Sequence, residues 1–183
     1  MNRSLLRVAV ATVAVTALAG CGSGAAPAAP PAAPPPAPSA ATQAAPAPAP
    51  APGVPPLTGN PTDLTAPSQA QAGTGQPPTK LVTQDIVIGT GKKAVPTDTV
   101  DVQYSGTLYS DGSLFDSSWQ RGEPASFPLD GVVPGFAQGI EGMQVGGRRV
   151  IVIPPDLGYG NRANGPIPAG STLVFVVDLV GIS

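Results

Sequence analysis

The fold is decided by the stretch VVPGFAQGIEGM, residues 132–143, which carries the only helical pattern in the C-terminal part of the chain. Phe136, Ile140 and Met143 recur at i, i+4 and i+7, so a helix would place them on one apolar face. Pro134 favours a helix start because its ring fixes φ and it has no N–H to leave unpaired. Since a single short helix has no helical partner, we expect its apolar face to pack against a sheet.

Strand patterns flank this stretch on both sides. The sequence predicts strands over residues 81–88, 99–108, 113–119, 125–129, 148–153 and 171–182. The last two are apolar on both faces, which is typical of central strands. Asp111-Gly112 is typical of a hairpin turn. We therefore predict an α+β domain, residues 80–183, with a twisted antiparallel sheet.

Composition separates this domain from the chain before it. Residues 25–79 hold 17 of the 25 prolines and one charged residue, Asp63. Such a segment has too little large apolar surface to offset chain entropy, so we expect residues 21–79 to form a disordered Ala/Pro-rich linker. It would serve as a spacer or, less simply, as a Pro-rich ligand for a partner. Residues 80–183 carry seven Lys/Arg and ten Asp/Glu, a balance that argues against nucleic acid as a partner.

The first 20 residues have the pattern of a targeting segment. Arg3 and Arg7 precede an apolar run, 8–19, that is short for a bilayer span. The run ends Leu18-Ala19-Gly20-Cys21, which resembles a bacterial lipobox, where the Cys is lipidated and becomes the first residue. The alternatives are an ordinary secretory signal and an uncleaved anchor. We expect a lipoprotein signal peptide over 1–20 and an acylated Cys21 that holds the chain on the extracytoplasmic side of the cell membrane.

The residue types that are absent exclude several classes of chemistry. With no His, the chain has no Ser-His-Asp triad and no His-ligated zinc. The single Cys precedes residues 80–183, so this part holds neither a disulfide nor a thiol nucleophile. We expect no metal and no other cofactor.

Three other motifs are weak signals for function. Gly89-Thr90-Gly91-Lys92 lacks the first Gly and the final Ser or Thr of a phosphate loop. Asp111 is explained by its turn, and no motif places it opposite Asp116 as a glycosidase pair. For Arg148 and Arg149 we expect one exposed charge and one ion pair at a sheet edge.

The aromatic residues are few and widely spread. Six of the eight lie in six different predicted elements: Tyr104, Phe115, Phe127, Phe136, Tyr159 and Phe175. For any one of them, core packing is the simpler interpretation. Tyr159 lies in a Gly-flanked loop, however, and Asp116 follows Phe115 in strand-like sequence, where burial would require a hydrogen-bond partner. Both features favour an apolar cleft with a few polar groups, the usual form of a ligand site.

Taken with their spacing, these residues resemble the FKBP-type peptidyl-prolyl cis-trans isomerases over essentially all of 80–183. The matching runs are VQYSG (102–106), DG (111–112), FDSS (115–118), FPL (127–129), VVPG (132–135), IPPDLGYG (153–160), IP (167–168) and TLVF (172–175). The resemblance implies an antiparallel sheet wrapped around one short helix. It also implies catalysis of rotation about X–Pro bonds in proteins that fold outside the cytoplasm.

The resemblance assigns two sets of site residues. The implied catalytic residues are Tyr104, Asp116, Val133 and Tyr159. The implied substrate-binding residues are Phe115, Phe127, Val132, Phe136, Ile167 and Phe175. The implied partners are proline-containing segments of envelope or secreted proteins, together with tacrolimus and rapamycin.

Two positions depart from the family pattern. Phe136 stands where much of the family has Trp, and Ala125 stands where a further aromatic residue is usual. We expect the pocket to remain apolar with fewer contacts to a ligand. These departures keep open a non-catalytic peptide-binding or chaperone module as an alternative, and a purely structural envelope lipoprotein as a third.

Overall fold

We describe a computed structural model of the chain that covers residue 49 and residues 51–183. These residues belong to one compact unit, 42–183. The predicted signal peptide over 1–20, the lipidated Cys21 and the linker up to residue 48 lie outside the described residues. Within the described part, no helix is both long and apolar enough to cross a bilayer.

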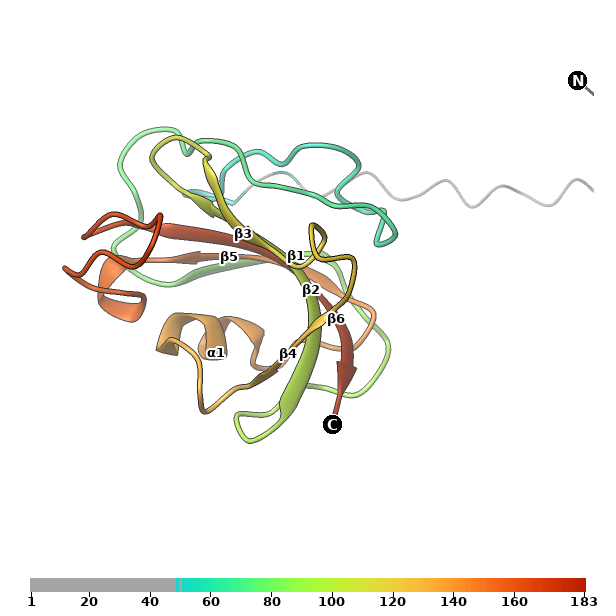
Figure 1. The fold of residues 1–183 in the computed structure, drawn as a ribbon. Helices are drawn as coiled ribbons and strands as arrows, with labels where there is room; N and C mark the ends of the chain where they lie inside the picture. The colour runs from blue at the N-terminus through green and yellow to red at the C-terminus, as the bar shows by residue number, and fades with distance from the viewer. Residues whose placement is uncertain (1–48, 50) are drawn as a thin grey trace, which may run out of the picture. The chain divides into compact units, whose positions relative to one another are not determined.

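The described chain forms one antiparallel sheet and one short α-helix. The strands are β1 (Val82–Val87), β2 (Thr99–Leu108), β3 (Leu114–Ser117), β4 (Ala125–Pro128), β5 (Arg148–Ile153) and β6 (Leu173–Ile182), with helix α1 (Pro134–Ile140) and a single 3₁₀ turn η1 (Pro155–Leu157). The sheet order is β1-β5-β6-β2-β3, and β4 also pairs with β2. The sheet curves around α1 (Figure 1), which confirms the predicted fold.

One edge of β2 is shared by two short strands. Gly106 is opposite Asp116 of β3, and Val100 is opposite Phe127 of β4. The chain between β3 and β4, residues 118–124, leaves the sheet and returns to it. This interruption places the end of β3 and the loop after it at the side of the concave face.

Two glycines bring α1 close to β5. An added Cβ would lie 2.3 Å from Ile153 Cγ2 at Gly135 and 2.4 Å from Ile151 Cγ2 at Gly139. Spaced i and i+4, these two positions lie on one side of the helix, so α1 can rest directly on the strand. The predicted apolar face is buried as well, although the helix ends at Ile140, before Met143.

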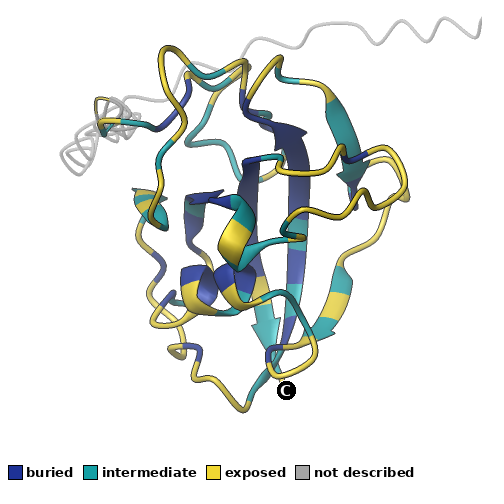
Figure 2. Ribbon diagram, turned by 90° about the vertical axis from the view of Figure 1, so that its left-hand side faces the viewer, coloured by how far each residue is buried: buried dark blue, intermediate teal, exposed yellow. Residues whose placement is uncertain are grey.

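The central strands are apolar on both faces, as the sequence predicts. Their burial is evident in Figure 2, where β5 and β6 are almost entirely buried. Since side chains alternate along a strand, Ile151, Ile153, Leu173, Phe175 and Val177 face α1. The opposite face presents Val150, Val152, Val174 and Val176. This second face needs its own cover.

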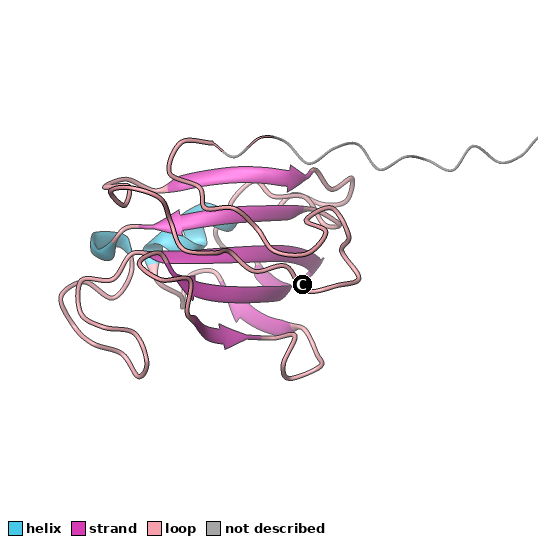
Figure 3. Cartoon of the chain, turned by 90° about the horizontal axis from the view of Figure 1, so that it is seen from above, coloured by secondary structure: helices cyan, strands magenta, loops and turns pink. Residues whose placement is uncertain are grey.

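The cover is supplied by residues 51–79, and here the structure differs from the predicted linker. Val54 and Ala70 are buried in one cluster with the valines of the back face. Leu57 and Ala70 form an isolated antiparallel bridge. Figure 3 shows loop segments crossing the strands on the side away from the helix. A proline-rich segment has fewer unfolded conformations to lose, so a few apolar contacts suffice to order it.

The two arginines of β5 correct another expectation. Arg149 makes the predicted edge pair, with Nε 2.6 Å from Asp85 Oδ1 of β1. Arg148 is completely buried, whereas the sequence predicted that one of the two arginines would be an exposed charge. Its Nη2 lies 2.6 Å from Asp178 Oδ2 on β6, the residue directly opposite it in the sheet. A buried charge requires such a partner, and Asp178 supplies it.

Candidate active site

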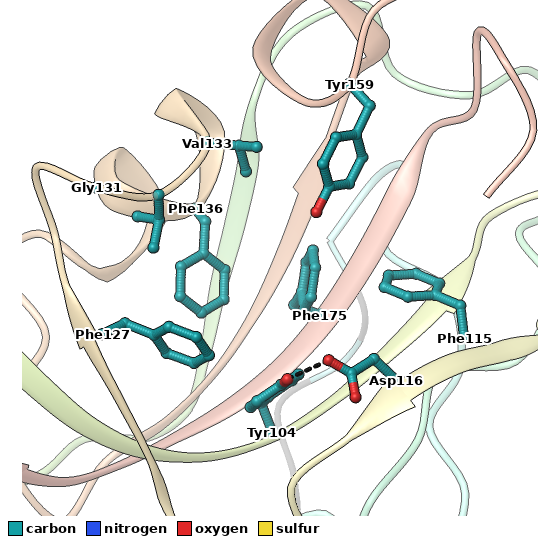
Figure 4. A pocket seen from close by; sticks show the side chains of 10 residues that line it. Tyr104, Phe115, Asp116, Phe127, Gly131, Val133, Phe136, Tyr159 and Phe175 are labelled. Atoms are coloured by element: carbon teal, nitrogen blue, oxygen red, sulfur yellow. Dashed lines mark hydrogen bonds between the residues drawn. The ribbon is translucent and has the colours of Figure 1, made fainter. Parts of the chain in front are cut away.

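A pocket of about 380 Å³ opens on the concave side of the sheet, next to the start of α1. Its lining residues are Tyr104, Phe115, Asp116, Phe127, Gly131, Val132, Val133, Phe136, Tyr159 and Phe175 (Figure 4). Nine of the ten residues that the sequence assigned to the site therefore come together. Ile167 does not line the pocket; it is 4% exposed and packs in the adjoining core. Gly131, which the sequence analysis did not include, takes a place in the wall.

Phe136 forms the floor. Its ring centroid lies 5.1 Å from that of Phe175 and 5.8 Å from that of Phe127, with the rings inclined at 69° and 79°. Tyr104 approaches the same ring at 6.5 Å. Edge-to-face contacts of this kind are favourable arrangements for aromatic rings. The floor is set by α1, because Phe136 directly follows the glycine that allows the helix to approach β5.

A glycine of β2 makes room for the side wall. A Cβ added to Gly106 would lie 2.7 Å from the ring of Phe115 and 2.9 Å from that of Phe175. Without that atom, the two rings meet over the strand at 5.5 Å and 85°. The glycine in the motif VQYSG therefore serves the pocket by the close approach of two aromatic rings.

The polar groups of the pocket form one hydrogen-bonded cluster. The Tyr104 hydroxyl donates to Asp116 Oδ2 (Figure 4), and Ser117 N donates to Asp116 Oδ1 at 2.8 Å. Arg121 completes the cluster from the loop after β3. Its Nη1 lies 2.7 Å from Asp116 Oδ1, and its Nη2 donates to the Tyr104 oxygen at 3.0 Å. The carboxylate is thus held from three sides.

Sequence reasoning missed Arg121. Its signal is weak, because a basic residue five positions after Asp116 reaches that carboxylate only if the chain folds back at the end of β3. The guanidinium carbon also lies 5.5 Å from the centre of the Tyr104 ring, within range of a cation–π contact. Arg121 therefore orients Asp116 and Tyr104 together.

The cluster keeps a fixed protonation state around neutral pH. Burial acts to raise the pKa of Asp116, but the hydrogen bonds from Tyr104 and Arg121 outweigh it and hold this pKa below its ordinary value. Burial, helped by the bond to Asp116, raises the pKa of Tyr104 to about 12. At neutral pH the pocket therefore presents an ionised carboxylate and a neutral phenol, and neither group titrates there.

Two further hydrogen-bond donors belong to residues that line the pocket, Val133 and Tyr159. The carbonyl of Val133 accepts hydrogen bonds from Phe136 N and Ala137 N at the start of α1. In the part of the chain that the structure describes, the N–H of Val133 has no acceptor, as is usual where a helix begins. Tyr159 follows η1, and its hydroxyl points into the pocket (Figure 4). A bound carbonyl group could accept from either donor.

The site is therefore an aromatic pocket with an ionised carboxylate and two phenol groups among its lining residues. The model of the family described as FKBP-type peptidyl-prolyl cis-trans isomerase matches residues 90–180. The chain belongs to this family and is an isomerase of the FKBP type.

The chain is similar to two bacterial FK506-binding proteins over more than half of its length. The probable FK506-binding protein of Corynebacterium glutamicum is 45% identical over 112 residues, 61% of this chain and 95% of that protein. The FK506-binding protein of Streptomyces anulatus is 46% identical over 112 residues, 59% of this chain and 90% of that protein.

Solved structures agree with the fold. The crystal structure of FkpA from Escherichia coli is 48% identical, with a TM-score of 0.55, over 57% of this chain and 49% of that chain. The crystal structure of AtFKBP13 is 36% identical, with a TM-score of 0.53, over 58% of this chain and 95% of that chain.

Proposed function

We propose that this isomerase assists the folding of proteins outside the cytoplasm by rotating X–Pro bonds, and that it does so by desolvation and hydrogen bonding. The observation that carries the mechanism is the pocket itself, in which aromatic rings surround a few fixed polar groups. None of these groups is a nucleophile or a base that titrates near neutral pH.

The reaction requires no covalent step. Rotation about X–Pro crosses a barrier of about 18–20 kcal/mol, because amide resonance must be broken. The Pro ring would enter between Phe127, Phe136 and Phe175 and leave water behind. An apolar surrounding weakens the charge-separated resonance form of the planar amide more than it weakens the twisted state, so the barrier falls.

Two donors would orient the substrate. The free N–H of Val133 would donate to the carbonyl of the residue before Pro, and the hydroxyl of Tyr159 would hold a neighbouring carbonyl. Lowering the barrier by about 6 kcal/mol would accelerate rotation roughly 10⁴-fold. Desolvation together with preset dipoles is sufficient for an effect of this size.

Asp116 would organise the pocket and would not transfer a proton. Its carboxylate is already bonded to Tyr104 and Arg121, and its lowered pKa keeps it ionised. It therefore fixes the Tyr104 ring against the rings of Phe127, Phe136 and Phe175. Its charge is balanced by that of Arg121, so this side of the pocket carries a fixed ion pair.

The mechanism is tested by a protease-coupled isomerisation assay on a proline-containing peptide. Tyr159→Phe should lower kcat/KM by about two- to tenfold, the effect of one hydrogen bond. Asp116→Ala should lower it further, because Tyr104 and Arg121 both lose their acceptor. Glu123→Ala, which removes an exposed acid from the loop that carries Arg121, is the matched control. A chain that binds the peptide but does not accelerate its isomerisation would instead be a peptide-binding or chaperone module.

Ligand binding is a second part of the proposal. We propose that the pocket also takes tacrolimus and rapamycin, because its apolar lining is present apart from the indole at position 136. Since Phe offers less contact area than Trp, both ligands should bind more weakly than they do to relatives with Trp at this position.

The extracytoplasmic setting is proposed from the lipobox before Cys21. Two acyl chains on this residue would hold the protein at a membrane surface, whereas one chain holds only marginally. Fractionation of cells that produce the full chain tests this proposal. Cys21→Ala should release the protein from the membrane, and Ser23→Ala should not. Complete retention of the Cys21→Ala variant in membranes would exclude a lipid anchor at this residue.

A further inference from the structure

Residues 51–79, which we call the strap, lie before the part of the chain that the family model matches. The family model begins only at residue 90. The strap crosses the face of the sheet opposite α1 (Figure 1, cyan to green). The isomerase pocket lies on the other face, so no strap residue lines it.

The first attachment of the strap is a buried charge. Arg148 Nη1 donates to the carbonyl of Pro61 at 3.0 Å, and its Nη2 donates to that of Ala66, also at 3.0 Å. The same guanidinium binds Asp178, and the Arg148 side chain is fully buried. A buried guanidinium must have its N–H donors satisfied. The strap supplies two of the acceptors, so it helps to satisfy the N–H donors of the buried guanidinium.

The second attachment lies on the turn between β2 and β3. Gly73 N donates to the carbonyl of Tyr109 at 2.8 Å, and the Tyr109 hydroxyl donates to the carbonyl of Thr74 at 3.4 Å. A Cβ added to Gly73 would lie 2.1 Å from the Tyr109 ring. Gly73 therefore rests flat on the face of a ring that is only 4% exposed, an approach that no other residue could make.

The turn itself is also in contact with the strap. Gly112 has φ of 73°, and a Cβ there would lie 2.7 Å from Ala72 N. The turn is closed by bonds from Leu108 N to Ser113 O and from Gly112 N to Leu108 O. The strap thus holds both the first residue of the turn and its tip.

This turn leads directly into the wall of the pocket. β3 is four residues long and carries Phe115 and Asp116. It pairs only with β2 within the described sheet, and the register shifts between Gly106 and Thr107. The turn fixes where this short edge strand begins, and the contacts of Phe115 with Phe175 and of Asp116 with Tyr104 hold it further along. A shift of the turn would therefore move Phe115 and Asp116 away from these partners.

We infer that the strap is a functional part of the isomerase domain and that it positions β3. Gly73 and Tyr109 are the positioning residues, and they act on Phe115 and Asp116. The inference rests on the proposed mechanism, because Phe115 and Asp116 line and organise the substrate pocket in that mechanism. Neither Gly73 nor Tyr109 contacts the substrate. Their effect reaches the pocket through the turn.

The test uses the full chain with Gly73→Ala, which places a methyl group against the Tyr109 ring and leaves the Arg148 attachment untouched. Amide hydrogen exchange over residues 114–117 should become faster, while exchange in β5 and β6 stays as in the wild type. Because displacements of about 1 Å at a site cost large factors in rate, kcat/KM should fall about tenfold. Thr74→Ala is the matched control, since it alters an exposed side chain of the same segment.

Two further measurements separate positioning from a general loss of stability. The single variant Tyr109→Phe removes only the hydroxyl that donates to Thr74, so exchange over 114–117 should become faster while exchange in β5 and β6 stays as in the wild type. In the wild-type chain, bonds within 51–79 should resist limited proteolysis until the domain unfolds. Unchanged exchange and unchanged kcat/KM in Gly73→Ala would overturn the inference, as would cleavage of the strap in the folded wild type. If the wild type itself proved inactive, the mechanism would fail, but exchange over 114–117 would still decide the role of the strap.

Discussion

Gly135 lies so close to Ile153 that a methyl group on its Cα would stand 2.3 Å from Ile153 Cγ2. This contact sets the distance between α1 and β5, and the next residue along the helix, Phe136, is the floor of the pocket. The depth of the isomerase site is therefore fixed by a glycine that no substrate touches.

Replacement of Gly135 by Ala should push α1 away from β5. Both stability and catalysis should fall, the stability by about 1–3 kcal/mol, the usual cost of overpacking a core. Denaturant unfolding and the isomerisation assay measure the two effects. Gln138→Ala, on the exposed side of the same helix, should change neither. Full activity in Gly135→Ala would mean that the helix can move without disturbing the floor.

Replacement of Phe136 by Trp should tighten the binding of tacrolimus. The added indole area contributes on the order of 1–2 kcal/mol if it is covered by the ligand. Calorimetric titration measures the affinity. The new indole should also report binding by its fluorescence, whereas Trp119, the only native Trp, lies outside the pocket lining and should respond weakly. Unchanged affinity would show that Phe136 is not the floor.

Activity should be nearly flat between about pH 6 and 8, since the chain has no His and neither polar group of the cluster titrates in this range. The lowered pKa of Asp116 means that its ionised form stabilises the fold above its unfolded pKa, and this contribution is lost as pH falls through the lower folded value. Loss of the Tyr104 proton begins only near its pKa of about 12. A bell-shaped rate profile centred near neutrality would contradict the mechanism.

Replacement of Arg121 by Ala should raise the pKa of Asp116 toward its ordinary value, because one of the three hydrogen bonds that lower it is removed together with the charge of the guanidinium. NMR titration of the Asp116 carboxyl carbon measures this shift. The global stability should change by only about 0–1 kcal/mol, since both side chains of the pair are nearly half exposed. Arg162→Ala, which removes an exposed arginine that does not line the pocket, serves as the control. An unaltered Asp116 pKa would show that Tyr104 and Ser117 N hold the carboxylate without help from Arg121.

Replacement of Arg148 by Ala should be far more costly, about 3–5 kcal/mol, because it leaves the Asp178 carboxylate buried without its partner. It also removes the donor that binds the carbonyls of Pro61 and Ala66. Thermal and denaturant unfolding measure the loss. Lys92→Ala breaks an exposed ion pair and should change stability little. Equal effects from the two variants would mean that the buried pair is not coupled to the fold.

The sequence anticipated the strands whose patterns are strongest. The predicted bounds of β2 and β5 agree with the structure at both ends, since their alternating or two-sided apolar patterns begin and end sharply. The pocket residues followed from motifs whose spacing the family shares. The structure places Ile167 in the core beside the pocket. The sequence did not indicate this, because a loop position next to a proline does not reveal whether its side chain turns toward the pocket or into the core.

The strap and Arg121 could not be found in the same way. The strap has few large apolar side chains, and its order depends on a sheet face that is formed by residues about 80 to 120 positions further along the chain. The two-sided apolarity of β5 and β6 did indicate that another segment covers the back face of the sheet, because a face of four valines is unfavourable in water. Arg121 depends on a fold-back of the loop after β3, which no local pattern records.

The valine face under the strap also determines where the chain can be truncated to give a soluble fragment. A fragment that starts at residue 80 would carry every residue of the pocket and still expose Val150, Val152, Val174 and Val176 to water. Uncovered apolar patches of this kind promote association between molecules. A soluble fragment for crystallisation or inhibitor screening should therefore begin no later than Ala49, where the carbonyl still accepts a hydrogen bond from Gln84 of β1.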